Sequence, residues 1–151
     1  MTNPLFYAKI LLFGEYGIIE DSQGLTLPYS FYKGAFKFSD LSSDFEKKSN
    51  AHLQKYADYL TGLVLPKGFE LDVTPLKKDI ANGLFFDSNI PQGYGVGSSG
   101  ALVAAIFEKY SLKKYSPETI SKLELKDLKV VFGQLESYFH GKSSGIDPLI
   151  C

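Results

Sequence analysis

The sequence predicts an α+β fold in a single domain that spans residues 1–151. Two observations lead to this class. Short apolar and aromatic runs separated by turn residues fill the first 40 positions, which is typical of strands. Longer segments with apolar residues at helical spacing dominate the remainder, with further strands between them. Strands followed by helices favour α+β architecture. Because 44% of the residues are hydrophobic, the chain can bury one packed core.

The strands are predicted from apolar runs that stop at turn residues. The run Phe6–Phe13 is rich in aromatic and branched side chains and stops at Gly14, as a buried strand would. A turn at residues 21–24 separates two short segments, and a partly alternating segment follows them. The further predicted strands are Gly17–Glu20, Leu25–Tyr29, Phe31–Phe38, Leu71–Val73 and Leu84–Ile90.

The helices are predicted from caps and from apolar stripes. One helix begins near Ser43, because Glu46 three residues later completes a capping box. Its apolar stripe consists of Phe45, Leu53, Tyr56, Ala57 and Leu60. Three more helices are expected at Ser99–Tyr110, Pro117–Leu123 and Asp127–His140, and Gly141 caps the last of them.

Charge and composition exclude several classes of partner. The formal net charge is −1, so the chain lacks the basic surface that nucleic-acid binding needs. All 16 cationic residues are lysine, so phosphate contacts must use lysine, backbone amides or a metal ion. No apolar run is long enough to cross a membrane, and Cys151 is the single cysteine. We expect a cytoplasmic protein without a nucleic-acid or membrane partner, and a homodimer stays open as its oligomeric state.

A glycine-rich segment, Pro91–Ala101 (PQGYGVGSSGA), is the strongest functional signal in the sequence. Glycine lets the backbone turn tightly and approach a ligand closely. Two serines then open a predicted helix, and the free amides at a helix start attract phosphate. The segment is not a Walker A loop, because no lysine follows Gly97. The G-x-G-x-x-G match lacks the strand-bound acidic residue of dinucleotide folds, so a nucleoside triphosphate is favoured.

Three other features could carry chemistry, and each has a simpler interpretation. Lys9 stands in the middle of an apolar strand, where it is either an edge lysine facing solvent or a buried lysine with an anionic partner. Glu136 lies one turn before His140 and could be an ordinary solvated helix residue. Asp147 ends the small-residue loop 142–147 and could simply cap a new helix.

Three segments together resemble a known family. They are Lys9–Tyr16 (KILLFGEY), Ile90–Ala101 (IPQGYGVGSSGA) and Glu136–Asp147 (ESYFHGKSSGID). They are similar to the motifs of the GHMP-family small-molecule kinases, and most of all to those of the mevalonate kinases. The resemblance implies the family's N-terminal domain, which is of the ribosomal protein S5 domain 2-like type, with a mixed sheet packed with helices. Because family members are longer, it also implies that the C-terminal domain is absent and that the isolated chain is truncated and inactive.

The resemblance assigns roles to residues of this chain. It implies that ATP and Mg²⁺ are bound, with Ser99 and Glu136 as ligands of the metal. Asp147 would orient or deprotonate the substrate hydroxyl, with Lys9 beside it. The implied nucleotide contacts are Pro91, Gly93, Gly95, Val96, Gly97, Ser98, Ser99, Gly100 and Ala101. The implied substrate contacts are Glu15, Tyr16, His140 and Ser144.

The expected reaction is ATP-dependent phosphorylation of the primary hydroxyl of mevalonate to 5-phosphomevalonate, a step of isoprenoid precursor synthesis. Tyr16 stands where many mevalonate kinases have histidine, and the same Gly-Glu-Tyr occurs in phosphomevalonate kinases, so these and other GHMP kinases are alternatives. Gly100 replaces the usual alanine, which we expect to be a small change. An inactive nucleotide-binding module is the non-enzyme alternative. A zinc site or hydrolase built on His52 and His140 is disfavoured.

Overall fold

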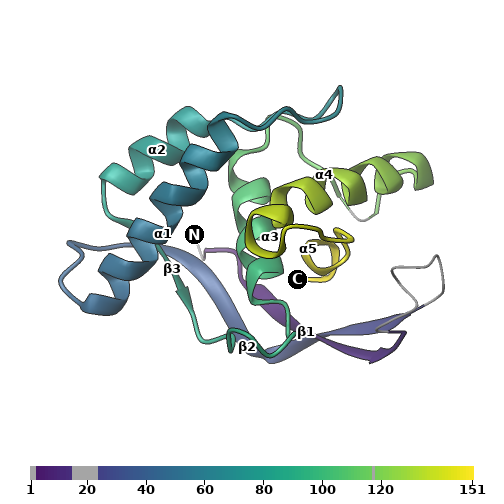
Figure 1. The fold of residues 1–151 in the computed structure, drawn as a ribbon, viewed down its shortest axis with the longest axis horizontal. Coiled ribbons are helices and arrows are strands. Elements are labelled where there is room, and N and C mark those ends of the chain that lie inside the picture. Colours follow the sequence, from purple (N-terminus) through teal and green to yellow (C-terminus); the bar gives the residue numbers. More distant parts are fainter. Residues whose placement is uncertain (1–2, 15–23, 117) are drawn as a thin grey trace.

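The computed structural model describes residues 3–14, 24–116 and 118–151. Three strands, β1 (Phe6–Phe13), β2 (Leu25–Phe38) and β3 (Leu84–Ser88), pair antiparallel in the order β1-β2-β3. Helices lie on one face of this sheet, with α3 at the centre (Figure 1). They are α1 (Asp44–Thr61), α2 (Val73–Ala81), α3 (Ser98–Tyr110), α4 (Lys122–His140) and α5 (Asp147–Ile150). The α+β class is confirmed, although the strand pairs in the described ranges are antiparallel where a mixed sheet was expected.

The strand predictions succeed where apolar runs are long. β1 has the predicted bounds, and β3 ends at Ser88, two residues earlier than predicted. The segments predicted as two strands form one 14-residue strand, β2, whose pairing with β1 shifts register between Tyr7 and Ala8. The strand predicted at Leu71–Val73 is wrong: Leu71 makes only an isolated bridge to Ser111. The strand predicted at residues 17–20 lies outside the described residues.

Capping residues explain where the helices begin. Ser43 and Glu46 form the predicted capping box of α1, and four of the five stripe residues are buried, whereas Phe45 is exposed. The side chain of Asp72 accepts a hydrogen bond from the Thr74 amide and starts α2, which the sequence analysis missed. The separate helix predicted at residues 117–123 is wrong. Pro117 lies outside the described residues, and α4 begins at Lys122 with a capping box of Ser121 and Glu124.

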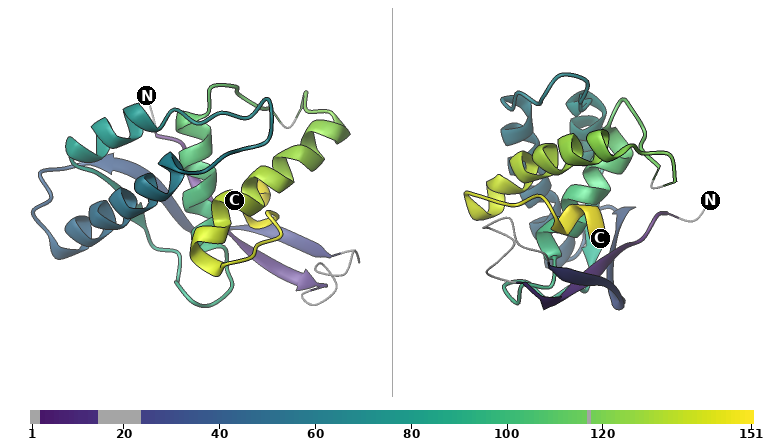
Figure 2. Two further views of the ribbon diagram at one scale, coloured as in Figure 1. Left: turned by 45° about the horizontal axis from the view of Figure 1, so that its top comes forward. Right: turned by 90° about the vertical axis from the view of Figure 1, so that its right-hand side faces the viewer.

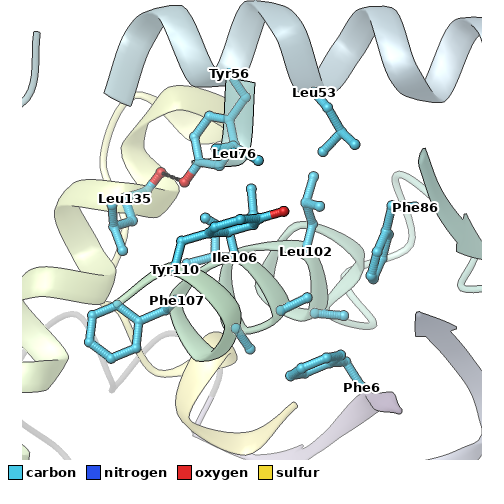
Figure 3. Packing of buried hydrophobic residues seen from close by; sticks show 14 of the residues in the cluster. Phe6, Leu53, Tyr56, Leu76, Phe86, Leu102, Ile106, Phe107, Tyr110 and Leu135 are labelled. Atoms are coloured by element: carbon cyan, nitrogen blue, oxygen red, sulfur yellow. Dashed lines mark hydrogen bonds between the residues drawn. The ribbon is translucent and has the colours of Figure 1, made fainter. Parts of the chain in front are cut away.

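The core surrounds α3. Figure 3 shows Leu102, Ile106, Phe107 and Tyr110 of α3 between Leu53 and Tyr56 of α1 and Phe6 of β1. Across the core, the buried Tyr56 hydroxyl donates a hydrogen bond of 2.8 Å to the carbonyl of Leu135 on α4 (Figure 3). Burial of α3 on nearly all sides therefore fixes the position of its first turn, where the glycine-rich loop arrives.

One end of the β1–β2 ribbon extends beyond the helical layer (Figure 2). Large apolar side chains there are exposed, including Phe13 at 69% and its pairing partner Leu25 at 47%. Helices cover the other end of the ribbon, at Phe6 and Phe36, where both side chains are buried. None of the helices in the described ranges is long and apolar enough to cross a membrane.

Candidate active site

The glycine-rich loop leads from β3 into α3, as predicted. Gly97 precedes the first residue of α3 with φ of 85°, a left-handed conformation that favours glycine. In the described part of the chain no side chain caps α3, so amides of its first turn remain available to an anion. The Lys9 amide donates a hydrogen bond of 2.9 Å to the carbonyl of Val96, which ties the loop to β1. This hydrogen bond therefore fixes the position of the loop relative to β1.

Lys9 and Asp147 form an ion pair beside this loop. The Lys9 ammonium lies 3.1 Å from Asp147 Oδ1, and the two side chains are 10% and 29% exposed. β1 is an edge strand, but the Lys9 side chain is buried and does not face solvent as the simpler interpretation held. A buried ammonium needs an anionic partner, and Asp147 in the first turn of α5 supplies it. Residues 138 positions apart in sequence thus meet at one point.

A second group of side chains connects α3 with the end of α4. The Ser99 hydroxyl donates a hydrogen bond of 2.9 Å to Glu136 Oε1 and lies 2.9 Å from His140 Nε2. Because this hydroxyl has one proton and gives it to Glu136, Nε2 of His140 is the donor in the second contact. Glu136 is only 2% exposed, and its other oxygen, Oε2, accepts a hydrogen bond from the Ser143 hydroxyl.

The environment of Glu136 disfavours its charged form. Burial raises the pKa of this carboxyl above 4.5, and repulsion from the Asp147 carboxylate raises it further. Hydrogen bonds from Ser143 and Ser99 and the nearby His140 act in the opposite direction. A buried, partly compensated carboxylate next to a second carboxylate is a good site for a cation, because a bound cation would stabilise both charges.

Gly100 sets the distance between α3 and α5. A Cβ atom at this position would lie 2.8 Å from Asp147 Cβ and 3.1 Å from the Pro148 nitrogen. Both distances are shorter than ordinary van der Waals contact, so the two helices approach this closely because position 100 has no side chain. We expected the replacement of the usual alanine by Gly100 to be a small change, but in this chain it lets Asp147 lie directly against the first turn of α3.

A cleft of about 990 Å³ opens above the loop, within the range of small-molecule sites. The glycine-rich loop, Ser99 and one face of α1 line it, and His140 and Asp147 line it as well. Three basic side chains of α1 line it: Lys48, His52 and Lys55. Sequence reasoning missed the two lysines and considered His52 only for a disfavoured zinc site or hydrolase, although the spacing of four and three residues places all three on one face of a helix.

The predicted nucleotide contacts differ in how well they are placed. Seven of them line the cleft: Pro91, Gly93, Gly95, Val96, Gly97, Ser98 and Ser99. Gly100 is buried against α5. Ala101 is fully buried and its amide donates to the Gly97 carbonyl, so it has no free group for a ligand.

The predicted substrate contacts divide in a similar way. His140 lies at the site, bonded to Ser99. Ser144 is exposed, and its hydroxyl accepts a hydrogen bond of 3.4 Å from the Ile146 amide, away from Glu136. Glu15 and Tyr16 lie outside the described residues.

A comparison with models of protein families shows to which family the chain belongs. Residues 51–151 match the family described as GHMP kinases N terminal domain. The chain belongs to the GHMP kinases. A search of curated proteins found no match, and a search of solved structures found none either. The matched segment includes the glycine-rich loop, Glu136 and Asp147, whereas Lys9 precedes it.

Membership of the GHMP kinases indicates an ATP-dependent small-molecule kinase with the α+β N-terminal domain of that family. The geometry agrees with this class, because the glycine-rich loop, two carboxylates and a lysine surround the same uncapped end of α3. The described residues contain no group of three or more His, Cys, Asp or Glu side chains that could hold a metal ion. A cation at Ser99 and Glu136 would therefore need further ligands, such as water and phosphate oxygens, which is the coordination typical of Mg²⁺.

Proposed function

We propose that this chain is the catalytic N-terminal part of a mevalonate kinase, which transfers the γ-phosphoryl group of ATP to the primary hydroxyl of mevalonate. One observation carries the proposal. The Ser99–Glu136 hydrogen bond and the Lys9–Asp147 ion pair flank the same uncapped helix start, so groups for phosphate, for a cation and for a hydroxyl lie together. Phosphoryl transfer requires mainly such positioning and charge neutralisation.

The nucleotide would lie in the cleft with its phosphates on the glycine-rich loop. The amides at the start of α3 would bind the β- and γ-phosphate oxygens, since a helix start favours negative charge. The Ser99 hydroxyl and Glu136 Oε1, which are 2.9 Å apart, would hold Mg²⁺. Held by these two residues, Mg²⁺ would supply positive charge that offsets the negative charge developing on the phosphate oxygens. Oxygen ligands of this type are the ones that Mg²⁺ prefers.

Asp147 and Lys9 would act on the acceptor. Asp147 lines the cleft and would accept a hydrogen bond from the substrate hydroxyl, which aligns the oxygen with the γ-phosphorus. A bond forms between that oxygen and phosphorus while the bond from phosphorus to the β–γ bridging oxygen breaks, and ADP leaves. The hydroxyl proton passes to the Asp147 carboxylate. The Lys9 ammonium, 3.1 Å from Asp147, would stabilise negative charge on the transferred group.

The acceptor is proposed from the segment Glu136–Asp147, which has every fixed residue of the mevalonate-kinase pattern E-x-x-x-H-G-x-x-S-G-x-D. His140 and Ser144 in this segment, with Glu15 and Tyr16, are proposed to contact mevalonate. The product, 5-phosphomevalonate, places the reaction in isoprenoid precursor synthesis. A single cysteine and the missing membrane-length apolar run agree with a cytoplasmic enzyme.

Phosphomevalonate kinase is the second candidate. Its substrate already has a phosphate, which needs additional cationic groups. Lys48 and Lys55 on α1 line the same cleft as the glycine-rich loop and could bind that phosphate. Because the chain contains no arginine, lysine is the only side chain with a permanent positive charge available for this contact.

The acceptor is tested by an ADP-release assay with MgATP on the full-length protein. The assay compares mevalonate, phosphomevalonate, homoserine and galactose at equal concentration. We expect turnover with mevalonate, and turnover with phosphomevalonate alone would assign the second candidate instead. Calorimetry on the same preparation measures the affinities for ATP and ADP, and it distinguishes a kinase from an inactive nucleotide-binding module. Nucleotide binding without turnover of any acceptor would favour a binding module.

A further inference from the structure

Ser143 is the polar residue at the site whose role nothing above explains. It lies in the loop between α4 and α5, and its hydroxyl donates to Glu136 Oε2. The Ser143 hydroxyl oxygen in turn accepts a hydrogen bond of 3.1 Å from the amide of Gly145. Because the Gly145 amide occupies a lone pair of this oxygen, the single proton of Ser143 points to Glu136. The direction of the Ser143–Glu136 hydrogen bond is therefore fixed by the loop backbone.

The loop itself is fixed on α4 by two glycines that face each other. Gly145 has φ of 71°, and a Cβ atom there would overlap the carbonyl of Lys129 and lie 2.6 Å from the Gly133 nitrogen. On α4, a Cβ atom at Gly133 would lie 3.0 Å from the Ser143 carbonyl oxygen. The backbone around Ser143 thus lies directly on the helix that carries Glu136, at a distance that larger residues would not permit.

The two oxygens of Glu136 are consequently held by different partners. Ser99 binds Oε1 and Ser143 binds Oε2. If the Ser99 hydroxyl turns to a metal ion, its hydrogen bond to Oε1 is lost, and the Ser143 bond remains. A carboxylate that binds a metal needs such an outer partner to keep its orientation. Ser143 satisfies this requirement from the side opposite Ser99.

We propose that Ser143 is a positioning residue, which holds Glu136 so that its Oε1 and the Ser99 hydroxyl oxygen can bind one divalent cation together. This inference rests on the proposed function, because it assumes that Ser99 and Glu136 hold the metal of a metal–nucleotide complex. Ser143 acts through Glu136 and does not line the cleft. The Ser143 hydroxyl holds Glu136 through its hydrogen bond to Oε2. Its loss should therefore weaken metal binding and leave the binding of metal-free nucleotide unchanged.

The test compares variants of Ser143 by metal binding. Mn²⁺ binding in the presence of ADP is measured by electron paramagnetic resonance, and ADP binding with excess chelator is measured by calorimetry. We expect S143A to weaken Mn²⁺ binding by about 10- to 100-fold, the usual effect of removing an outer partner of a metal ligand. ADP affinity in chelator should stay within twofold of wild type. Ser137→Ala is the matched control. Ser137 lies on α4, one residue after Glu136, but its hydroxyl donates to the Gly133 carbonyl and not to Glu136.

Two further variants of similar shape keep the inference testable if S143A does not fold. Ser143→Thr keeps the hydroxyl, whereas Ser143→Val has nearly the same shape without it, so any steric disturbance is common to both. We expect S143T to bind Mn²⁺ close to wild type and S143V to bind like S143A. Equal Mn²⁺ affinity in S143T and S143V would overturn the inference and leave the proposed function intact. Failure of the wild-type chain to bind Mn²⁺ with ADP would contradict the proposed function, and this inference with it.

Discussion

At the scale of single residues, Asp147 connects the two parts of the proposed site. Its carboxylate pairs with the Lys9 ammonium at 3.1 Å, and it also lines the cleft in which the acceptor would bind. The same carboxylate raises the pKa of Glu136. Asp147 is therefore placed to affect the proposed acceptor hydroxyl, Lys9 and the proposed metal ligand Glu136 together, and its charge can be tested with a minimal substitution.

Replacing Asp147 by asparagine removes the charge and the proton acceptor but keeps the size of the side chain. We expect D147N to lower turnover by about 10²- to 10⁴-fold, the range for loss of a general base or aligning group. ADP affinity measured by calorimetry should stay near wild type, because the glycine-rich loop is unchanged. Asp87→Asn is the control, since Asp87 pairs with Lys37 on the sheet. An undiminished rate in D147N would remove Asp147 from the mechanism.

We predict that the buried charge of Glu136 lowers the stability of the metal-free protein, although the proposed metal site needs this charge. Its pKa in the folded chain is above the ordinary 4.5, so the folded state binds a proton more tightly than the unfolded state does. Between the two pKa values the stability of the wild type therefore falls as pH rises. E136Q has no charge to bury, and at neutral pH we expect it to melt at a higher temperature than metal-free wild type while losing Mn²⁺ binding.

The difference between the two melting temperatures should depend on pH in a defined direction. As pH falls through the raised pKa of Glu136, the wild-type carboxyl becomes protonated and the advantage of E136Q should shrink. The difference in melting temperature between E136Q and wild type is measured by circular dichroism at several pH values across this titration. An advantage that stays constant with pH, or a lower melting temperature for E136Q at neutral pH, would show that burial does not disfavour the charge.

At the scale of helices and strands, local signals predicted the elements that carry their own start and stop residues. The capping box of Ser43 and Glu46 and the cap at Gly141 were read correctly because their hydrogen bonds join residues within one turn. Asp72 was missed as the cap of α2, because the apolar residues around it also fit a strand. α4 was divided in two, because Ser116 and Pro117 resembled a helix start and Ser121 was overlooked.

The capping box of α1 supports one wall of the cleft, and its contribution can be measured. Ser43→Ala removes the side-chain oxygen that accepts from the Glu46 amide at 3.2 Å. We expect the free energy of unfolding to fall by about 1 kcal/mol, the usual cost of losing a serine cap. Denaturant unfolding of S43A and of Ser42→Ala, which changes the neighbouring serine, gives the comparison. Equal effects of the two substitutions would show that the cap contributes nothing.

At the scale of the whole molecule, the site depends on contacts that no local pattern contains. Motifs in the sequence named Lys9, Ser99, Glu136 and Asp147, and the fold brings them together from β1, α3, α4 and α5. Lys48 and Lys55 of α1 were missed, because their position at the cleft depends on how α1 packs on β3 and α2. Ser143 was missed because its bond to Glu136 depends on the close crossing of Gly133 and Gly145.

The central claim is that these four residues surround one metal–nucleotide complex. Nuclear magnetic resonance of the full chain with ADP and substoichiometric Mn²⁺ tests it most directly, because Mn²⁺ broadens the signals of nearby nuclei. We predict broadening of amide signals around Ser99, Glu136 and Asp147 and in β1 near Lys9, while the amide signal of the exposed Val64 stays sharp. Broadening centred elsewhere, or none that depends on ADP, would contradict the account.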